Sequence, residues 1–156
     1  MFHRDVDPKR PRRRRQRASR YRVGLIGCGA IGSDIADGLR DAPWRLGLPY
    51  GHASVYQSLE RTELVAAADI AQDRLDAFAQ RWNFPRRHLY CDVHDMLANA
   101  RLDVVSIASP TPSHAEMTLA AITAGVRAIF LEKPTASIVK QNVCLTIEAH
   151  SGACIV

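Results

Sequence analysis

The stretch Gly27-Cys28-Gly29-Ala30-Ile31-Gly32 has the pattern Gly-x-Gly-x-x-Gly and begins where the strand-like run Tyr21–Gly27 ends. Ile31, Ile35 and Leu39 then follow at the spacing of one helix face. In dinucleotide-binding domains the first glycine of such a turn permits a tight bend, the second lets the backbone approach a pyrophosphate, and the third allows close packing of helix on strand. The start of the helix also offers free backbone N–H groups to phosphates. The turn therefore predicts a dinucleotide site that includes Gly27, Gly29, Ala30, Ile31 and Gly32.

From this turn outward, short apolar runs alternate with stretches of helical periodicity. The strand-like runs are Tyr21–Gly27, Glu63–Asp69, His88–Cys91, Asp103–Ser109, Val126–Leu131 and the start of another at Ala153–Val156. The further helical stretches carry their apolar residues at Leu75, Phe78, Ala79 and Trp82, at Ala115, Leu119 and Ile122, and at Val139, Val143 and Ile147. Strict alternation predicts an α/β domain with a doubly wound parallel sheet and right-handed crossovers.

Local signals mark where several helices begin and end. Ser113-His114-Ala115-Glu116 has the spacing of a capping box, and Gly125 stands where the C-terminus of that helix needs a left-handed residue. Asp92 can cap a short helix over Val93–Ala100. A further short helix is expected around His52–Leu59, after a loop rich in proline and glycine.

Asp69 ends the second strand-like run. A carboxylate at this place can accept hydrogen bonds from the adenosine ribose and repel the 2′-phosphate of NADP, which predicts NAD as the preferred cofactor and NADP as the alternative. The other interpretation makes Asp69 an ordinary strand-end cap. It lies 37 residues beyond Gly32, more than the ~20 of the simple unit, because Asp41–Glu60 is inserted between them. Arg74, five residues on, could turn toward such a phosphate.

The net charge of +5 comes from one end of the chain. Residues 1–22 carry ten Lys and Arg against Asp5 and Asp7, a net charge of +8, whereas the other 134 residues carry −3. We expect residues 1–20 to form a disordered basic tail. Such a tail can also bind nucleic acid, but here it lacks interleaved aromatic residues and a DNA-reading motif, so a nucleic-acid partner is the less favoured interpretation.

Length, apolar runs and cysteine spacing exclude other classes. The 156 residues correspond to about one domain, and no run approaches the ~20 apolar residues of a membrane span. Consecutive arginines occur in twin-arginine export signals, but the apolar stretch Val23–Gly27 is too short for one, so we expect a cytoplasmic protein. Cys28, Cys91, Cys144 and Cys154 have no metal-ligand spacing, so we expect free thiols and no metal.

Several of these segments together resemble the Gfo/Idh/MocA family, the relatives of glucose–fructose oxidoreductase and inositol dehydrogenase. They are Gly27–Gly32, the His52-Ala53-x-x-Tyr56 segment, Glu63–Asp69, the turn Ser109-Pro110-Thr111-Pro112-Ser113-His114-Ala115-Glu116, and Glu132-Lys133-Pro134. The likeness covers about residues 21–135 well and residues 136–156 loosely. Glu-Lys-Pro and the proline-rich turn are more specific than the glycine pattern.

The resemblance implies a Rossmann-type NAD(P)-binding domain over residues 21–156 and an oxidoreductase that acts on a sugar, polyol or related hydroxyl compound. It makes Lys133 the catalytic residue, beside the nicotinamide and the reacting carbon, where an ammonium can polarise a carbonyl or hydrogen-bond a hydroxyl. It places Ser109, Pro110, Glu132 and Lys133 at the cofactor. His114 either lies near the nicotinamide half or has a local structural role.

Members of this family also carry a second α/β domain, which supplies an Asp and a His for proton transfer and often forms the oligomer interface. No segment of this chain corresponds to that domain, so we expect a truncated or stand-alone cofactor domain that has little turnover alone. The alternatives are a catalytically inactive NAD(H)-binding module or subunit, and a nucleic-acid-associated protein that acts through its arginine tail.

Overall fold

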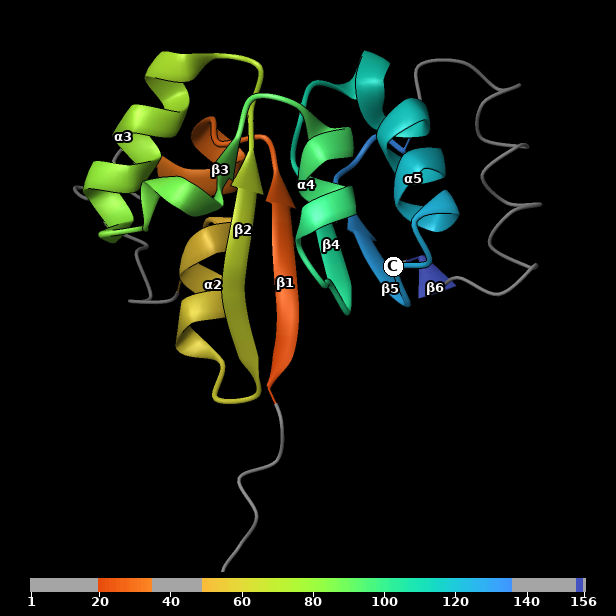
Figure 1. Cartoon of the computed structure of the whole chain (residues 1–156), viewed down its shortest axis with the longest axis horizontal. Coiled ribbons are helices and arrows are strands. Elements are labelled where there is room, and N and C mark those ends of the chain that lie inside the picture. The colour runs from red at the N-terminus through yellow and green to blue at the C-terminus, as the bar shows by residue number, and fades with distance from the viewer. Residues whose placement is uncertain (1–19, 35–48, 136–153, 156) are drawn as a thin grey trace, which may run out of the picture.

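The computed structural model describes residues 20–34, 49–135 and 154–155. Within these residues, six parallel strands form one sheet in the order β3-β2-β1-β4-β5-β6 (Figure 1). The strands are β1 (Tyr21–Ile26), β2 (Thr62–Ala68), β3 (Leu89–Tyr90), β4 (Val104–Ile107), β5 (Ala128–Leu131) and β6 (Cys154–Ile155). The order runs outward from β1 in both directions, which confirms the predicted doubly wound α/β fold. In such sheets a crevice opens beyond the carboxyl ends of the strands at the reversal, here between β1 and β4.

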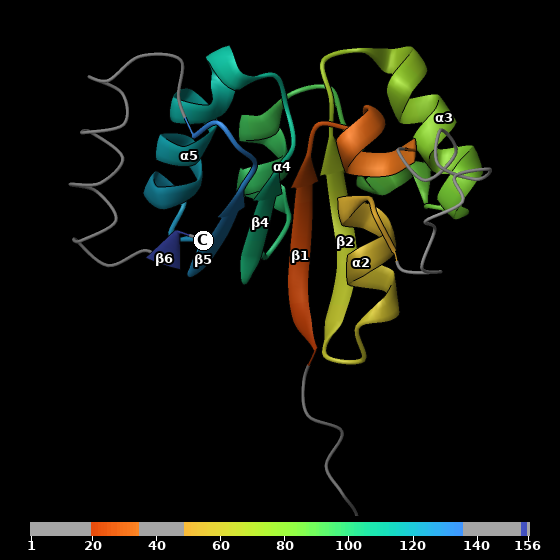
Figure 2. The ribbon, with the colours of Figure 1, turned by 180° about the vertical axis from the view of Figure 1, so that it is seen from behind.

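Four α-helices cover the sheet in the part of the chain that the structure describes. They are α2 (His52–Ser58), α3 (Gln72–Trp82), α4 (Val93–Asn99) and α5 (His114–Thr123). Shorter turns are η1 (Ala30–Asp34), η2 (Arg86–His88) and η3 (Thr111–Ser113). α4 lies in front of the sheet in Figure 1, and α2 lies in front of it in the opposite view of Figure 2. None of these helices has the length and apolarity needed to cross a membrane.

Each face of the sheet carries its own hydrophobic core, and the second half of β2 (residues 64–68) is continuously apolar because it contributes to both. Ala66 and Ala68 pack on the side of α4 and α5, whereas Ala67 packs on the side of α2 and α3. Successive side chains of a strand point to opposite faces, so a strand covered on both sides needs apolar residues at every position. The alanines also let the helices on both faces approach the sheet closely.

The sequence signals at helix ends are confirmed at three places. The Asp92 carboxylate accepts a hydrogen bond from the backbone N–H of His94 at 2.6 Å and caps α4. Gly125, with φ of +77°, follows the end of α5. α2 begins at His52 as expected. Some predicted segments lie outside the described residues, namely Ile35, Leu39, the stripe from Val139 to Ile147 and residues 1–19 of the basic tail.

One prediction about α5 is wrong. Ser113 forms no capping box with Glu116, because η3 precedes the helix and already places Ser113 in helical geometry, with φ −90° and ψ −8°. Its hydroxyl donates instead to the Pro110 carbonyl at 2.8 Å. Of the apolar stripe Ala115, Leu119 and Ile122, Leu119 is 38% exposed, and the buried positions of α5 include three small residues. They are Ala115, Thr118 and Ala121.

Candidate functional site

In the glycine-rich turn after β1, each glycine is required, or left open, by a different feature of the surrounding structure. Gly27 has φ of +95°, and its backbone N–H donates to the Ala68 carbonyl at 2.8 Å. A Cβ at Gly32 would lie 2.0 Å from the Gly27 carbonyl oxygen. A Cβ at Gly29 would meet nothing closer than a guanidinium nitrogen of Arg74 at 3.4 Å. Gly27 and Gly32 are therefore required by the fold, whereas the outer side of Gly29 is open. Ala30, the next residue, is exposed.

Asp69, directly after β2, turns its carboxylate back toward this turn. One oxygen accepts a hydrogen bond from the backbone N–H of Cys28 at 2.8 Å, and the other accepts one from the N–H of Ala71 at 2.9 Å. Nη1 of Arg74 lies 3.8 Å from the first oxygen. The Ala71 contact is the strand-end cap that the sequence left open as an alternative. Each oxygen has a second lone pair, so the cap does not prevent Asp69 from accepting a ligand hydroxyl.

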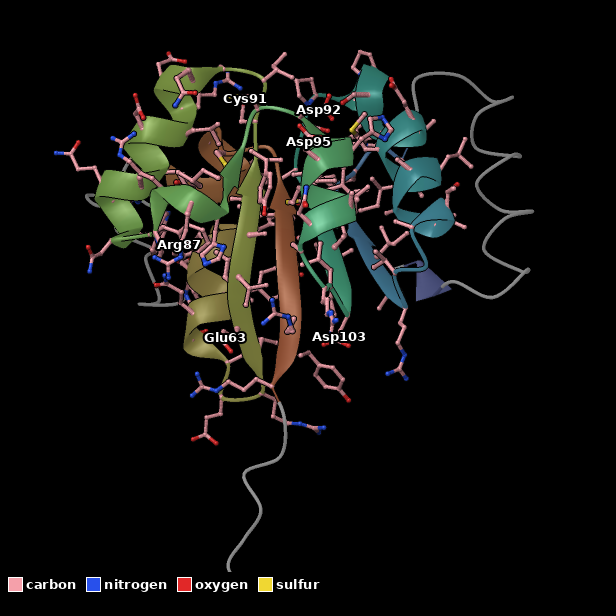
Figure 3. The ribbon with its side chains drawn as sticks, viewed as in Figure 1. Glu63, Arg87, Cys91, Asp92, Asp95 and Asp103 are labelled. Carbon is pink, nitrogen blue, oxygen red and sulfur yellow. The ribbon has the colours of Figure 1, made fainter. Side chains whose placement is uncertain are left out.

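A pocket of about 300 Å³ opens beside Asp69 at the carboxyl edge of the sheet. The ends of β1, β2, β3 and β4 all contribute to its walls, and Figure 3 shows Cys91 and Asp92 at this edge and Glu63 and Asp103 near the opposite one. Of the predicted site residues, it brings Gly27, Asp69, Ser109 and Pro110 together. Its walls include the apolar side chains of Ile70 and Met117, and Ile70 is 92% exposed.

Several lining residues were not singled out as site residues in the sequence, namely Ile70, Cys91, His94 and Met117. Ile70 and Cys91 follow the ends of β2 and β3 within two residues, and His94 lies in the first turn of α4, which begins shortly after β3. Their positions after predicted strands are the signal that could have found them, since ligands of open α/β sheets bind outside the carboxyl ends of strands. Met117 lies inside α5, and its place in the pocket depends on how that helix packs.

The two described thiols near this edge differ in environment. Cys28 is buried and Cys91 is exposed. Burial raises the pKa of the Cys28 thiol from 9.0 to about 12, and the negative charge of Asp69 adds to the effect while Arg74 opposes it. Cys28 is therefore a neutral thiol in the buried interior, whereas Cys91 lines the pocket and is accessible to reagents.

The Glu132-Lys133-Pro134 segment follows β5, on the far side of β4 from β1. The Glu132 carboxylate accepts a hydrogen bond from the backbone N–H of Lys133 at 3.0 Å, and its other oxygen lies 3.2 Å from Nε2 of His52. The Lys133 side chain is exposed. The structure thus divides the predicted site residues between the pocket beside Asp69 and the end of β5.

His114 lies at the start of α5 and is 1% exposed. Its Nε2 lies 2.7 Å from the Ser109 carbonyl oxygen and its Nδ1 lies 2.9 Å from the Pro134 carbonyl oxygen. Both ring nitrogens therefore contact backbone of this chain. Of the two roles that the sequence left open for His114, this geometry matches the local structural one.

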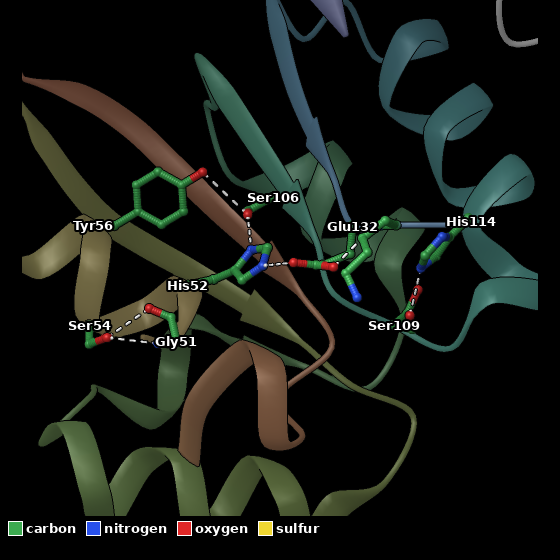
Figure 4. Close-up of polar contacts among 9 residues, drawn as sticks. Gly51, His52, Ser54, Tyr56, Ser106, Ser109, His114 and Glu132 are labelled. Carbon is green, nitrogen blue, oxygen red and sulfur yellow. Dashed lines mark hydrogen bonds and ion pairs between the residues drawn. The ribbon is translucent and has the colours of Figure 1, made fainter. Parts of the chain in front are cut away.

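A buried polar cluster on the α2 side was missed in the sequence (Figure 4). Nδ1 of His52 lies 2.6 Å from Oγ of Ser106, and the Tyr56 hydroxyl donates to the same Oγ at 3.2 Å. Burial raises the pKa of Tyr56, although the hydrogen bond to Ser106 opposes the shift. The available signal was Ser106, a polar residue within an apolar strand.

Among residues 20–34, 49–135 and 154–155, no three His, Cys, Asp or Glu side chains gather as metal ligands would.

The chain resembles proteins of known activity. The family model described as "Oxidoreductase family, NAD-binding Rossmann fold" matches residues 21–155. D-apiose dehydrogenase from Paraburkholderia graminis is 32% identical over 117 residues, which are 75% of this chain and 26% of that protein. Inositol 2-dehydrogenase 3 from Saccharopolyspora erythraea is 36% identical over 132 residues, which are 84% of this chain and 32% of that protein. The chain spans about a quarter to a third of the length of these relatives.

Solved structures show the same fold. An NAD binding oxidoreductase from Klebsiella pneumoniae has a TM-score of 0.62 at 30% identity, over 88% of this chain and 34% of that one. A scyllo-inositol dehydrogenase from Lactobacillus casei, solved with NAD(H) and scyllo-inositol, has a TM-score of 0.66 at 19% identity, over 85% of this chain and 34% of that one. The family match over residues 21–155 confirms the resemblance found in the sequence, and the chain belongs to the Gfo/Idh/MocA oxidoreductase family through its NAD-binding Rossmann domain.

Proposed function

We propose that this chain provides the nicotinamide-nucleotide site of an oxidoreductase that moves a hydride between NAD and a hydroxyl compound of the sugar or polyol class. The observation that carries the proposal is the open side of Gly29, which faces Arg74. Arg74 and Asp69 both line the apolar pocket next to this turn. A pyrophosphate needs a turn without a Cβ, and an adenosine needs an apolar slot with an acceptor for its ribose. The names of the relatives, D-apiose dehydrogenase and inositol 2-dehydrogenase, support the substrate class.

In this proposal the adenosine half occupies the pocket beside Asp69. The base packs against Ile70 and Met117, and the ribose hydroxyls donate to the free lone pairs of the Asp69 carboxylate. The 2′-phosphate of NADP would bring a second negative charge within a few ångströms of that carboxylate, so NAD binds more tightly. Arg74 is 52% exposed and offsets part of the repulsion, so that NADP binds more weakly rather than not at all.

Lys133 is the proposed catalytic residue. The nicotinamide supplies the hydride acceptor or donor when the cofactor is bound. The exposed ammonium of Lys133 hydrogen-bonds the substrate hydroxyl, or polarises the corresponding carbonyl in the reverse direction. Ser109 and Pro110, after β4, and Glu132, after β5, border the path of the cofactor between the pocket and this lysine.

The same proposal treats residues 21–156 as the cofactor domain and residues 1–20 as a separate basic extension, with trypsin expected to remove the extension first. It also assigns substrate positioning to the part of the relatives' length that has no counterpart in this chain. Positioning accounts for about 7–11 kcal/mol of barrier lowering in well-oriented reactions. We therefore expect these 156 residues to bind NAD(H) with little or no turnover.

Gly29→Ala tests the proposal, because an alanine Cβ there meets only the flexible end of Arg74. The variant should keep the thermal unfolding temperature of the parent and bind NADH about tenfold more weakly in calorimetric titration, since its methyl group occupies the pyrophosphate position. Absence of NADH binding by the parent chain, or equal affinity of parent and variant, would contradict the proposal.

A further inference from the structure

The residues on both sides of Lys133 are each held by a buried histidine from a different part of the chain. His52, from α2, is 7% exposed and contacts the Glu132 carboxylate. His114, from α5, is 1% exposed and contacts the Pro134 carbonyl oxygen. Lys133 itself is exposed. One long, exposed side chain thus lies between two residues that buried histidines contact.

The contacts of His52 form a directional series (Figure 4). The Tyr56 hydroxyl donates to Oγ of Ser106, which lies 2.6 Å from Nδ1 of His52. A carboxylate only accepts hydrogen bonds, so Nε2 of His52 must carry the hydrogen toward Glu132. Nδ1 then accepts the Ser106 hydroxyl hydrogen, so each hydrogen of the series is donated to one acceptor. The series ends where the second Glu132 oxygen accepts the backbone N–H of Lys133 at 3.0 Å.

The serine and histidine of this series do not form a nucleophilic site. Ser106 lies within β4 and has no exposed surface, so a substrate cannot reach its hydroxyl. The His52 ring is also fixed from the side by Phe130, whose ring lies 5.2 Å away in an edge-on arrangement. Buried polar groups are costly unless all partners are present. What the fully partnered series provides is a single orientation of the Glu132 carboxylate.

His114 acts on the other side of Lys133. Its two ring nitrogens join the Ser109 carbonyl, at the end of β4, to the Pro134 carbonyl. Carbonyl oxygens only accept, so each contact is a hydrogen bond when the ring nitrogen that faces the carbonyl carries a hydrogen. His114 therefore ties the segment after β5 to the neighbouring strand end.

We propose that His52 and His114 are positioning residues that fix the backbone on both sides of Lys133. His52 acts through the Glu132 carboxylate and His114 through the Pro134 carbonyl. The inference rests on the proposed function of Lys133. A lysine side chain has many rotamers, so a fixed backbone on both sides reduces the range of positions that its ammonium can take. The inference predicts an effect confined to the nicotinamide half of the cofactor.

The test compares His52→Leu, which removes both ring hydrogen bonds, with His52→Gln, whose amide keeps a donor for Glu132, in the full 156-residue chain. NMR hydrogen exchange of the Lys133 amide should become about tenfold faster in His52→Leu and recover in part in His52→Gln. NADH affinity should fall about fivefold in His52→Leu while ADP-ribose affinity stays within about twofold, because ADP-ribose lacks the nicotinamide. His114→Gln, which retains only one of the two contacts, should shift the same ratio in the same direction.

His88→Leu is the matched control, since His88 is half-buried in η2 and contacts neither side of Lys133. It should change neither the exchange rate nor the ligand ratio. If His52→Leu does not fold, His52→Gln and Tyr56→Phe carry the test and must show the same asymmetry at a smaller size.

An unchanged Lys133 exchange rate in folded variants, or equal losses of NADH and ADP-ribose, would overturn the inference. Failure of the parent chain to bind either ligand would instead contradict the proposed function, and the exchange rates would still measure the backbone positioning.

Discussion

The two ends of the candidate site are constructed in opposite ways. Beside Asp69 the chain leaves a pocket of about 300 Å³, bordered by an Ile70 side chain that is 92% exposed. Beside Lys133 it packs polar groups tightly, with His52 and His114 both below 10% exposure. Space for a flat apolar group suits affinity, and a rigid polar surround suits the placement of one reactive side chain. The comparison predicts that substitutions at the first end change which nucleotide binds, and that substitutions at the second change how its nicotinamide half is held.

Gly32→Ala should have the largest effect, because it removes the turn on which both ends depend. The new Cβ would lie 2.0 Å from the Gly27 carbonyl oxygen, a backbone atom that cannot move without displacing the end of β1. Overpacking of this kind costs about 3 kcal/mol or more. We expect loss of the cooperative thermal transition, measured by circular dichroism. A Gly32→Ala chain as stable as Gly29→Ala would show that the turn tolerates a side chain at both positions.

Thiol labelling should distinguish the pocket from the buried core beside it. The pKa of Cys28 is raised to about 12, so at pH 8.5 its thiolate fraction is about a thousandfold below that of an ordinary thiol. Peptide mapping after iodoacetamide treatment should find Cys91 modified and Cys28 intact. Because Cys91 lines the pocket, NADH should slow its modification. Equal rates of Cys91 modification with and without saturating NADH would show that the nucleotide does not bind in this pocket.

Asp69→Asn should change cofactor preference at the open end. Removing the negative charge should improve the NADP-to-NAD affinity ratio about tenfold, equivalent to about 1.4 kcal/mol. Asn keeps an oxygen acceptor for one of the two backbone N–H groups that Asp69 binds, so the fold should survive with a modest loss of stability. Calorimetric titration of both nucleotides measures the ratio.

Asp73→Asn is the control for that measurement, because Asp73 is an exposed residue in the first turn of α3 and does not line the pocket beside Asp69. It should leave the nucleotide ratio unchanged. If both variants shift the ratio equally, the preference comes from net charge rather than from the Asp69 carboxylate.

The open end could be predicted from the sequence because its rules are local. Gly27–Gly32 and Asp69 each follow a strand directly, and their roles depend on the turn that leaves that strand. The packed end could not, because His52 contacts Ser106 and Glu132, which are 54 and 80 residues away. The error at Ser113 has a related cause. Its hydroxyl had a competing acceptor in the Pro110 carbonyl, which became available only once η3 formed.

Lys133→Met should have the smallest effect on the fold and isolates the chemical role of the packed end. Methionine keeps an unbranched apolar stem and removes the ammonium. Because Lys133 is exposed, its free energy of unfolding should change by no more than about 0.5 kcal/mol. The backbone N–H donated to Glu132 is retained, so the contacts of His52 should persist. NADH affinity should still fall about fivefold relative to ADP-ribose, because only NADH carries the nicotinamide that the proposed function places beside the ammonium. Arg127→Met, an exposed cation before β5, should change neither ligand. Equal affinities of parent and Lys133→Met for NADH would show that the lysine does not contact the nicotinamide half. The two histidines would then hold a segment that has no contact with the ligand.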